Sequence, residues 1–214
     1  MKKIYAFLCM LVIVASPLAA QSSTSTDRAA DDAKGAVAFI AKLGEDTKAV
    51  WSDSNMTAAE RSTAFRALFE KSTDIRLLAR AMLGRHFRTI NKEQRANYMA
   101  AMRNYIVAQF DGRMAQIGFK TIEVVGTKAA SGKRGDIFVK TRITRDEGQA
   151  ILADWRIRKK KGVFYIINLD FEGINLMITT RDVFASRVKR DGIEGLITWL
   201  QVEGGTVLTA SADE

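Results

Sequence analysis

Few residues of this sequence could do chemistry, and a pair of carboxylates is the clearest candidate. Asp170 and Glu172 lie two positions apart, directly after the apolar segment Val163 to Leu169. Residues two apart on a strand share one face, so the pair could act as a general acid and base. An outward polar face, or a partner for arginine and lysine, is the commoner role of such a pair. The pair keeps a hydrolase open as one alternative.

His86 is the only histidine, and it lies close to Arg85 and Arg88. A Ser-His-Asp triad would have to use it, whereas a partly exposed structural histidine is the simpler interpretation. No carboxylates have the spacing of a metal site, and no phosphate-cradling glycine motif occurs. We therefore expect no catalytic residues, no metal and no cofactor, and a binding protein rather than an enzyme.

The N-terminus has the order of a secretory signal. Lys2 and Lys3 precede an apolar run from Ile4 to Val14, and Leu18-Ala19-Ala20 follows as a cleavage site. The signal, residues 1–20, holds both the only cysteine and the only proline. The exported domain would therefore have no disulfide and depend on its core alone. We expect a periplasmic protein.

The charge of the chain is basic. The formal net charge is +9, and removal of Lys2 and Lys3 with the signal leaves +7. Basic proteins of this kind meet nucleic acid, anionic lipid or acidic protein surfaces. Export argues against nucleic acid, so anionic head groups and acidic partners remain.

The first half of the sequence has helical periodicity. After a polar linker at 21–26, a helix is expected from about Asp27, and Gly44 should end or loosen it. Further helix starts are marked by capping residues: the capping box of Thr57 with Glu60, then Asp74, then Asn91.

From Phe119 the apolar period changes to two, which predicts strands. A first strand near 122–125 should break at Gly126, and strands at 137–144, 151–158 and 163–169 complete an antiparallel meander. This order predicts an α+β domain over 27–203, with N-terminal helices packed on one face of a curved antiparallel sheet and short C-terminal helices after it. Gly204-Gly205 should end the last helix, leaving a flexible tail at 204–214.

Between Asp74 and Leu200 a series of short motifs occurs in a fixed order: Ala79–Gly84 (ARAMLG), Phe87-Arg88, Gln94-Arg95, Val139–Thr141, Trp155-Arg156, Phe171–Leu176 (FEGINL), Arg181, Phe184 and Asp191–Leu196 (DGIEGL). In these motifs the region resembles the MlaC family of periplasmic phospholipid-binding proteins, also known for toluene tolerance. The family's usual Trp near Phe164, Asp at Asn168 and Ser at Asn175 are replaced here.

The resemblance implies an apolar cavity between sheet and helices that holds lipid acyl chains. It also implies a shuttle that exchanges phospholipid with an outer-membrane lipoprotein complex and an inner-membrane ABC-transporter complex, and so maintains outer-membrane lipid asymmetry. A carrier of another amphiphile, such as a hopanoid, and an exported hydrolase are the alternatives. We expect the pocket to be lined by Leu78, Met82, Tyr98, Met102, Tyr105, Val139, Ile143, Ala153, Trp155, Ile174 and Leu176.

Four basic residues alternate with the apolar residues of the two central strands. Lys140, Arg142, Arg156 and Arg158 should point away from the apolar side of the sheet. Either these residues form a solvated face, or they form a docking surface for acidic partner proteins or anionic head groups.

Overall fold

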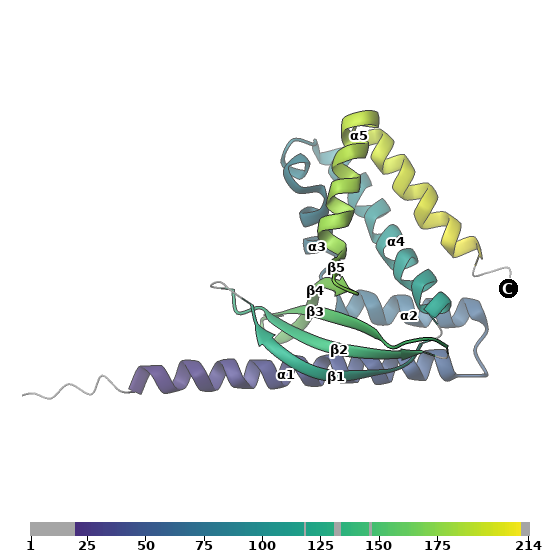
Figure 1. Cartoon of the computed structure of the whole chain (residues 1–214). Helices are drawn as coiled ribbons and strands as arrows, with labels where there is room; N and C mark the ends of the chain where they lie inside the picture. Colours follow the sequence, from purple (N-terminus) through teal and green to yellow (C-terminus); the bar gives the residue numbers. More distant parts are fainter. Residues whose placement is uncertain (1–19, 118, 131–133, 146, 211–214) are drawn as a thin grey trace, which may run out of the picture.

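The computed structural model describes residues 20–117, 119–130, 134–145 and 147–210, so the predicted signal peptide lies outside the described residues except for Ala20. Helices come first, a sheet follows, and a long helical element ends the chain (Figure 1). The elements are α1 (Ala20–Ser52), α2 (Ala58–Ser72), α3 (Ile75–Leu83), the 3-10 helix η1 (Gly84–Arg88), α4 (Lys92–Ile117), β1 (Phe119–Ala129), β2 (Ile137–Arg145), β3 (Ile151–Lys160), β4 (Val163–Phe171), β5 (Ile174–Asn175) and α5 (Leu176–Ala210).

The strands form one antiparallel meander in the order β1-β2-β3-β4-β5. Apolar and polar residues alternate along β2 and β3, so one face of the sheet is buried. On this face Val139 pairs with Trp155. Ala36 and Ile40 of α1 belong to the same buried apolar cluster as these two residues. The predicted α+β fold class, with helices on one face of a curved antiparallel sheet, is confirmed.

Helix α1 is longer at both ends than the sequence predicted. It begins at Ala20, so residues 21–26 belong to the helix and do not form the expected linker. It also continues through Gly44, where a Cβ would lie 3.1 Å from Cβ of Ile122 in β1. Gly44 therefore does not end the helix; the missing side chain lets the helix approach the strand closely. In Figure 1 α1 lies lengthwise along the sheet.

The prediction that Gly126 ends the first strand is also wrong. Strand β1 runs on to Ala129, and its pairing with β2 shifts register between Val124 and Gly126. This irregularity is a β-bulge, in which one strand holds an extra residue and the ladder then resumes. Glycine within a strand commonly marks such a bulge.

A second apolar core lies among the helices α2, α3, α4 and α5. In Figure 1 α3, α4 and α5 stand above the sheet, whereas α2 lies at the level of the sheet. The predicted caps are present: Thr57 and Glu60 form a capping box before α2, Asp74 accepts from Leu77 N before α3, and Asn91 accepts from Gln94 N before α4. Among the described residues, no helix is both long and apolar enough to cross a membrane.

Element α5 consists of two helices, as predicted, but both are longer than expected and the second does not end at Gly204. It breaks at Gly192, whose backbone (φ 71, ψ −177) is not helical, and both of its arms are several turns long. The second arm passes through Gly204 to Ala210, and residues 211–214 of the expected tail lie outside the described residues. A Cβ on Gly204 would lie 2.9 Å from the backbone nitrogen of Tyr105, so this glycine permits close packing of α5 on α4.

Candidate functional site

An apolar pocket lies where the helical core meets the buried face of the sheet. Its volume is about 80 Å³. Six elements supply its walls: the helices α2, α3, α4 and α5 and the strands β3 and β4. Its lining residues are Phe69, Thr73, Leu78, Met82, Tyr105, Ile106, Gln109, Phe110, Trp155, Ile166, Asn168, Leu169, Leu176, Met177 and Thr180.

Trp155 of β3 lies on the sheet side of this pocket together with residues of β4. A short chain of hydrogen bonds fixes its ring. The indole nitrogen Nε1 donates to Thr141 Oγ1 at 2.8 Å, and Thr141 Oγ1 in turn donates to the carbonyl of Ala153 at 3.2 Å. All three residues are buried on the inner face of β2 and β3. The ring therefore presents its apolar surface to the pocket while its one polar atom is already satisfied.

A smaller apolar cavity of about 30 Å³ continues from the pocket toward α1. Phe69, Phe110, Trp155 and Ile166 line both spaces and form the partition between them. The rings of Phe69 and Phe110 pack with their centroids 4.6 Å apart. Ligand pockets typically enclose 300 Å³ or more, so a long apolar ligand requires these rings to move or the helices to separate from the sheet.

Two buried polar atoms in the pocket lining have no hydrogen-bond partner among the described residues. They are the hydroxyl of Thr73 and the side-chain oxygen Oδ1 of Asn168. Both residues are more than nine-tenths buried. A buried polar atom without a partner is costly, and each of these two atoms could form a hydrogen bond with a polar group of a ligand.

The structure divides the predicted pocket residues into three groups. Leu78, Met82, Tyr105, Trp155 and Leu176 line the apolar pocket, and Ile143 lines the smaller cavity. Tyr98, Met102, Val139 and Ala153 are fully buried in the two packed cores. Ile174 is 57 % exposed and lies outside the lining.

Tyr98 shows why sequence pattern alone does not separate core from pocket. It shares a helical face with Tyr105, but its hydroxyl donates to the carbonyl of Ala79 at 2.8 Å. Burial raises its pKa well above the ordinary value, so the hydroxyl stays neutral. Tyr98 therefore fastens α4 to α3, whereas Tyr105 lies two turns further along α4 and reaches the pocket.

Sequence reasoning missed several lining residues, chiefly Phe69, Ile106, Phe110, Ile166 and Met177. Phe69, Ile106 and Phe110 do belong to the apolar stripes of α2 and α4, so periodicity could have nominated them. Ile166 and Met177 gave no such signal, because strand β4 is apolar at nearly every position and Met177 sits where β5 turns into α5.

The candidate catalytic carboxylates do not form a pair on one strand face. Glu172 follows the end of β4 in a turn with φ 50, and its carboxylate accepts a hydrogen bond from the backbone nitrogen of Leu152 at 2.5 Å. Asp170 accepts from the side-chain amides of Asn175 and Asn168. Burial and the charge of Asp154 raise the pKa of Asp170.

His86 is half-buried in η1. Among the described residues, no three of the types His, Cys, Asp and Glu are close enough to hold a metal.

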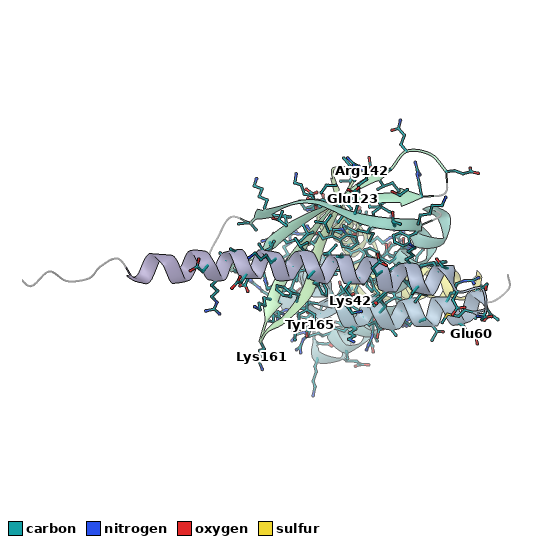
Figure 2. All side chains as sticks on the ribbon, turned by 90° about the horizontal axis from the view of Figure 1, so that it is seen from below. Lys42, Glu60, Glu123, Arg142, Lys161 and Tyr165 are labelled. Carbon is teal, nitrogen blue, oxygen red and sulfur yellow. The ribbon has the colours of Figure 1, made fainter. Side chains whose placement is uncertain are left out.

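The four basic residues of β2 and β3 have different surroundings. Lys140 and Arg142 are about half exposed and lie 3.7 Å from Asp154 and 3.6 Å from Glu123, respectively. Figure 2 shows Arg142 beside Glu123. Ion pairs of this length at the surface contribute at most about 1 kcal/mol, so both side chains remain available to a partner.

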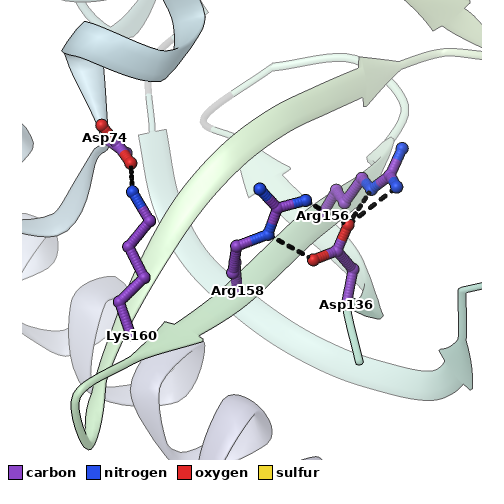
Figure 3. Close-up of polar contacts among 5 residues, drawn as sticks. All are labelled: Asp74, Asp136, Arg156, Arg158 and Lys160. Carbon is purple, nitrogen blue, oxygen red and sulfur yellow. Dashed lines mark hydrogen bonds and ion pairs between the residues drawn. The ribbon is translucent and has the colours of Figure 1, made fainter. Parts of the chain in front are cut away.

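Arg156 and Arg158 instead converge on one buried carboxylate. Asp136, in the segment before β2, is 1 % exposed and accepts from both guanidinium groups at 2.6–3.0 Å (Figure 3). Burial alone would raise the pKa of Asp136, but the hydrogen bonds and charges of Arg158 and Arg156 outweigh it and lower that pKa. Lys160, at the end of β3, forms an ion pair with Asp74 at the start of α3 (Figure 3).

A curved sheet with helices over an internal apolar pocket defines an α+β ligand-binding protein. The family model described as MlaC protein matches residues 42–202, and the chain belongs to this family. A search of curated proteins finds no match. A solved structure of a phospholipid-binding protein from Ralstonia solanacearum, in complex with a phospholipid, is similar in fold, with a TM-score of 0.60 and 17 % identity; the match covers 88 % of this chain and 99 % of that one.

Proposed function

We propose that this protein is a periplasmic carrier of phospholipid, which holds acyl chains in the apolar pocket between α2–α5 and the sheet. The observation that carries the proposal is the pocket itself, because its walls are apolar and it lies between two separate cores. The predicted secretory signal, the family and the phospholipid bound by the similar Ralstonia protein all support it.

The physics of lipid transfer agrees with this function. An acyl chain exposed to water costs about 0.8 kcal/mol per methylene, so a soluble carrier must hide the whole chain. A pocket between a sheet and a helical bundle can widen without unfolding either core, because each core has its own buried residues. Widening past Phe69 and Phe110 would join the pocket to the smaller cavity and lengthen it toward α1.

The proposed carrier exchanges lipid between an outer-membrane lipoprotein complex and an inner-membrane ABC-transporter complex. A docking surface for such exchange is the outer face of β2, where Lys140 and Arg142 are exposed. Arg156 and Arg158 were expected to share this surface, but Asp136 holds them in place. Exposed basic residues chiefly speed the encounter with an acidic or anionic partner.

Organic extraction of the purified protein, followed by lipid analysis, tests the proposal. Leu176 lines the pocket and is only half-buried. A glutamate there puts a carboxylate among acyl chains, at a cost of several kcal/mol unless it stays protonated. We expect Leu176→Glu to lose most of its bound lipid.

Ile174→Glu is the matched control, because Ile174 lies two residues away but is exposed. Sequence reasoning placed Ile174 in the pocket, so the two variants also distinguish the two placements. Circular dichroism should show both variants folded. Extracts of the parent without phospholipid would refute the carrier, and equal lipid content in the two variants would refute this pocket.

A further inference from the structure

A second, open pocket adjoins the apolar one. Its volume is about 470 Å³, and it lies between α3 and η1 on one side and strands β3 and β4 on the other. Asn168 and Met177 line both pockets, so the two spaces meet at these residues. A molecule with an apolar part in the first pocket can therefore extend a polar part into the second.

Arginine dominates the lining of this second pocket, which we call the arginine pocket. Arg80 comes from α3, Arg88 from η1, Arg134 from the segment before β2, and Arg156 and Arg158 from β3. Its described lining residues include no aspartate or glutamate.

The cluster is not neutralised by the protein itself. Asp136 offsets Arg156 and Arg158 with a single charge. Arg80 and Arg88 are exposed, and within the described part of the chain neither forms an ion pair. Arg80 lies over the ring of Phe87 at 5.4 Å, which orients its guanidinium without removing its charge.

Gly84 allows the guanidinium of Arg181 to approach the arginine pocket. Its backbone (φ 59, ψ −129) is one that L residues rarely adopt, and a Cβ there would lie 3.1 Å from Nε of Arg181. Arg181 of α5 therefore packs against the turn between α3 and η1, beside a residue that lines the arginine pocket. Like charges gathered in this way repel unless an anion joins them.

Arginine suits a phosphate better than a lone positive charge does. A guanidinium presents a planar fork of donors that matches two phosphate oxygens, and such charge-assisted bonds are among the strongest in proteins. Asn168 adds an acceptor: its Oδ1 has no described partner, while its amide nitrogen donates to Asp170. The arginine pocket thus offers many hydrogen-bond donors to an anion. It also offers one buried acceptor, Asn168 Oδ1, where the two pockets meet.

We propose that the arginine pocket binds the phosphate diester of a glycerophospholipid head group whose acyl chains occupy the apolar pocket. Asn168 Oδ1 accepts a hydrogen bond from a head-group ammonium or hydroxyl. This assignment rests on the proposed carrier function. It adds that the protein recognises the polar head group of the lipid as well as its acyl chains.

The test compares two double variants of equal charge change. Arg80→Gln with Arg88→Gln removes guanidiniums that line the pocket, and Arg76→Gln with Arg85→Gln removes exposed neighbours from the same two elements. Each purified protein is delipidated and titrated with a fluorescent phosphatidylglycerol and with a fluorescent diacylglycerol, which has the same chains but no phosphate. We expect the first pair to weaken phosphatidylglycerol binding about tenfold or more through lost charge-assisted contacts, and to leave diacylglycerol binding unchanged. The control pair should bind both as the parent does.

The outcomes separate the two proposals. If the parent binds neither lipid, the carrier function fails. If the parent binds both lipids and the Arg80/Arg88 variant loses no preference for phosphatidylglycerol, the head-group site fails and the carrier stands. Inorganic phosphate and glycerophosphate are added as competitors; displacement of the lipid by either at submillimolar concentration would make this a free-anion site and overturn the assignment.

Discussion

Replacement of Asp136 by asparagine tests the ion-pair cluster that joins β3 to the segment before β2. Asp136→Asn keeps the shape of the side chain but removes the charge that accepts four hydrogen bonds from Arg156 and Arg158. Loss of one partner from a buried ion pair costs about 3–5 kcal/mol. Here the Arg156 side chain is 36 % exposed and can be resolvated, so we expect a somewhat smaller loss, about 2–4 kcal/mol.

Urea denaturation followed by tryptophan fluorescence measures this loss. Domains of this kind are typically stable by about 5–15 kcal/mol, so the variant should still fold, with a clearly lower midpoint and an unchanged slope. Glu123→Gln is the control, because its pair with Arg142 is exposed and long; we expect its effect to stay below about 1 kcal/mol. A loss for Asp136→Asn no larger than that of the control would refute the assignment of a stabilising buried cluster.

The same variant has a defined pH dependence. The folded-state pKa of Asp136 is lowered, so its ionised form stabilises the fold above the unfolded pKa of about 3.9. This contribution disappears as the pH falls through the folded-state pKa. The difference in unfolding free energy between parent and Asp136→Asn should therefore be constant at neutral pH and shrink below about pH 4. A difference that persists unchanged at lower pH would show that packing, and not charge, is responsible.

Two other predictions follow from the packing and the surface charge. Gly204→Ala should destabilise the protein by about 1–3 kcal/mol, because the new Cβ meets the α4 backbone at 2.9 Å; Gly126→Ala, which meets nothing within 4 Å, should stay close to the parent in the same denaturation assay. Lys140→Gln with Arg142→Gln should slow the transfer of fluorescent phospholipid to anionic vesicles and flatten its salt dependence, with bound lipid unchanged. Transfer rates equal to those of the parent at low salt would show that Lys140 and Arg142 are ordinary solvated residues and not a docking surface.

The element types were predictable because local signals agreed with the fold, but three element ends were not. Gly44, Gly126 and Gly204 each look like a break in sequence, since glycine weakens helices and strands. In the structure Gly44 and Gly204 lie where another backbone or strand comes too close for a Cβ, and Gly126 lies at a bulge. A close approach is a property of the partner element, which no local pattern reveals.

The candidate site was only partly predictable for a similar reason. Apolar periodicity identifies residues that face inward, but Tyr98 and Leu78 both do so and differ only in what lies opposite them. The arginine pocket gathers residues from α3, η1, β3 and the segment before β2, which are far apart in the sequence. Alternation along β3 did place Arg156 and Arg158 on the side away from Trp155. Their convergence on Asp136 depends on how β2 begins, which the sequence pattern did not indicate.

The sizes of the two pockets suggest how a lipid enters. The apolar pocket has a volume of about 80 Å³, whereas that of the arginine pocket is about 470 Å³. The start of α3 is tied to the sheet, because Asp74 N donates to the carbonyl of Ile166 and the Asp74 carboxylate pairs with Lys160. The other end of α3 reaches Gly84, beside the arginine pocket. Asn168 and Met177 line both pockets, so the arginine pocket connects the apolar pocket to solvent at these two residues. On the proposed assignment, a lipid whose head group is held by the arginines would pass its acyl chains inward between Asn168 and Met177. The polar contacts would then form before the apolar chains leave their membrane, which lowers the cost of exposing them to water.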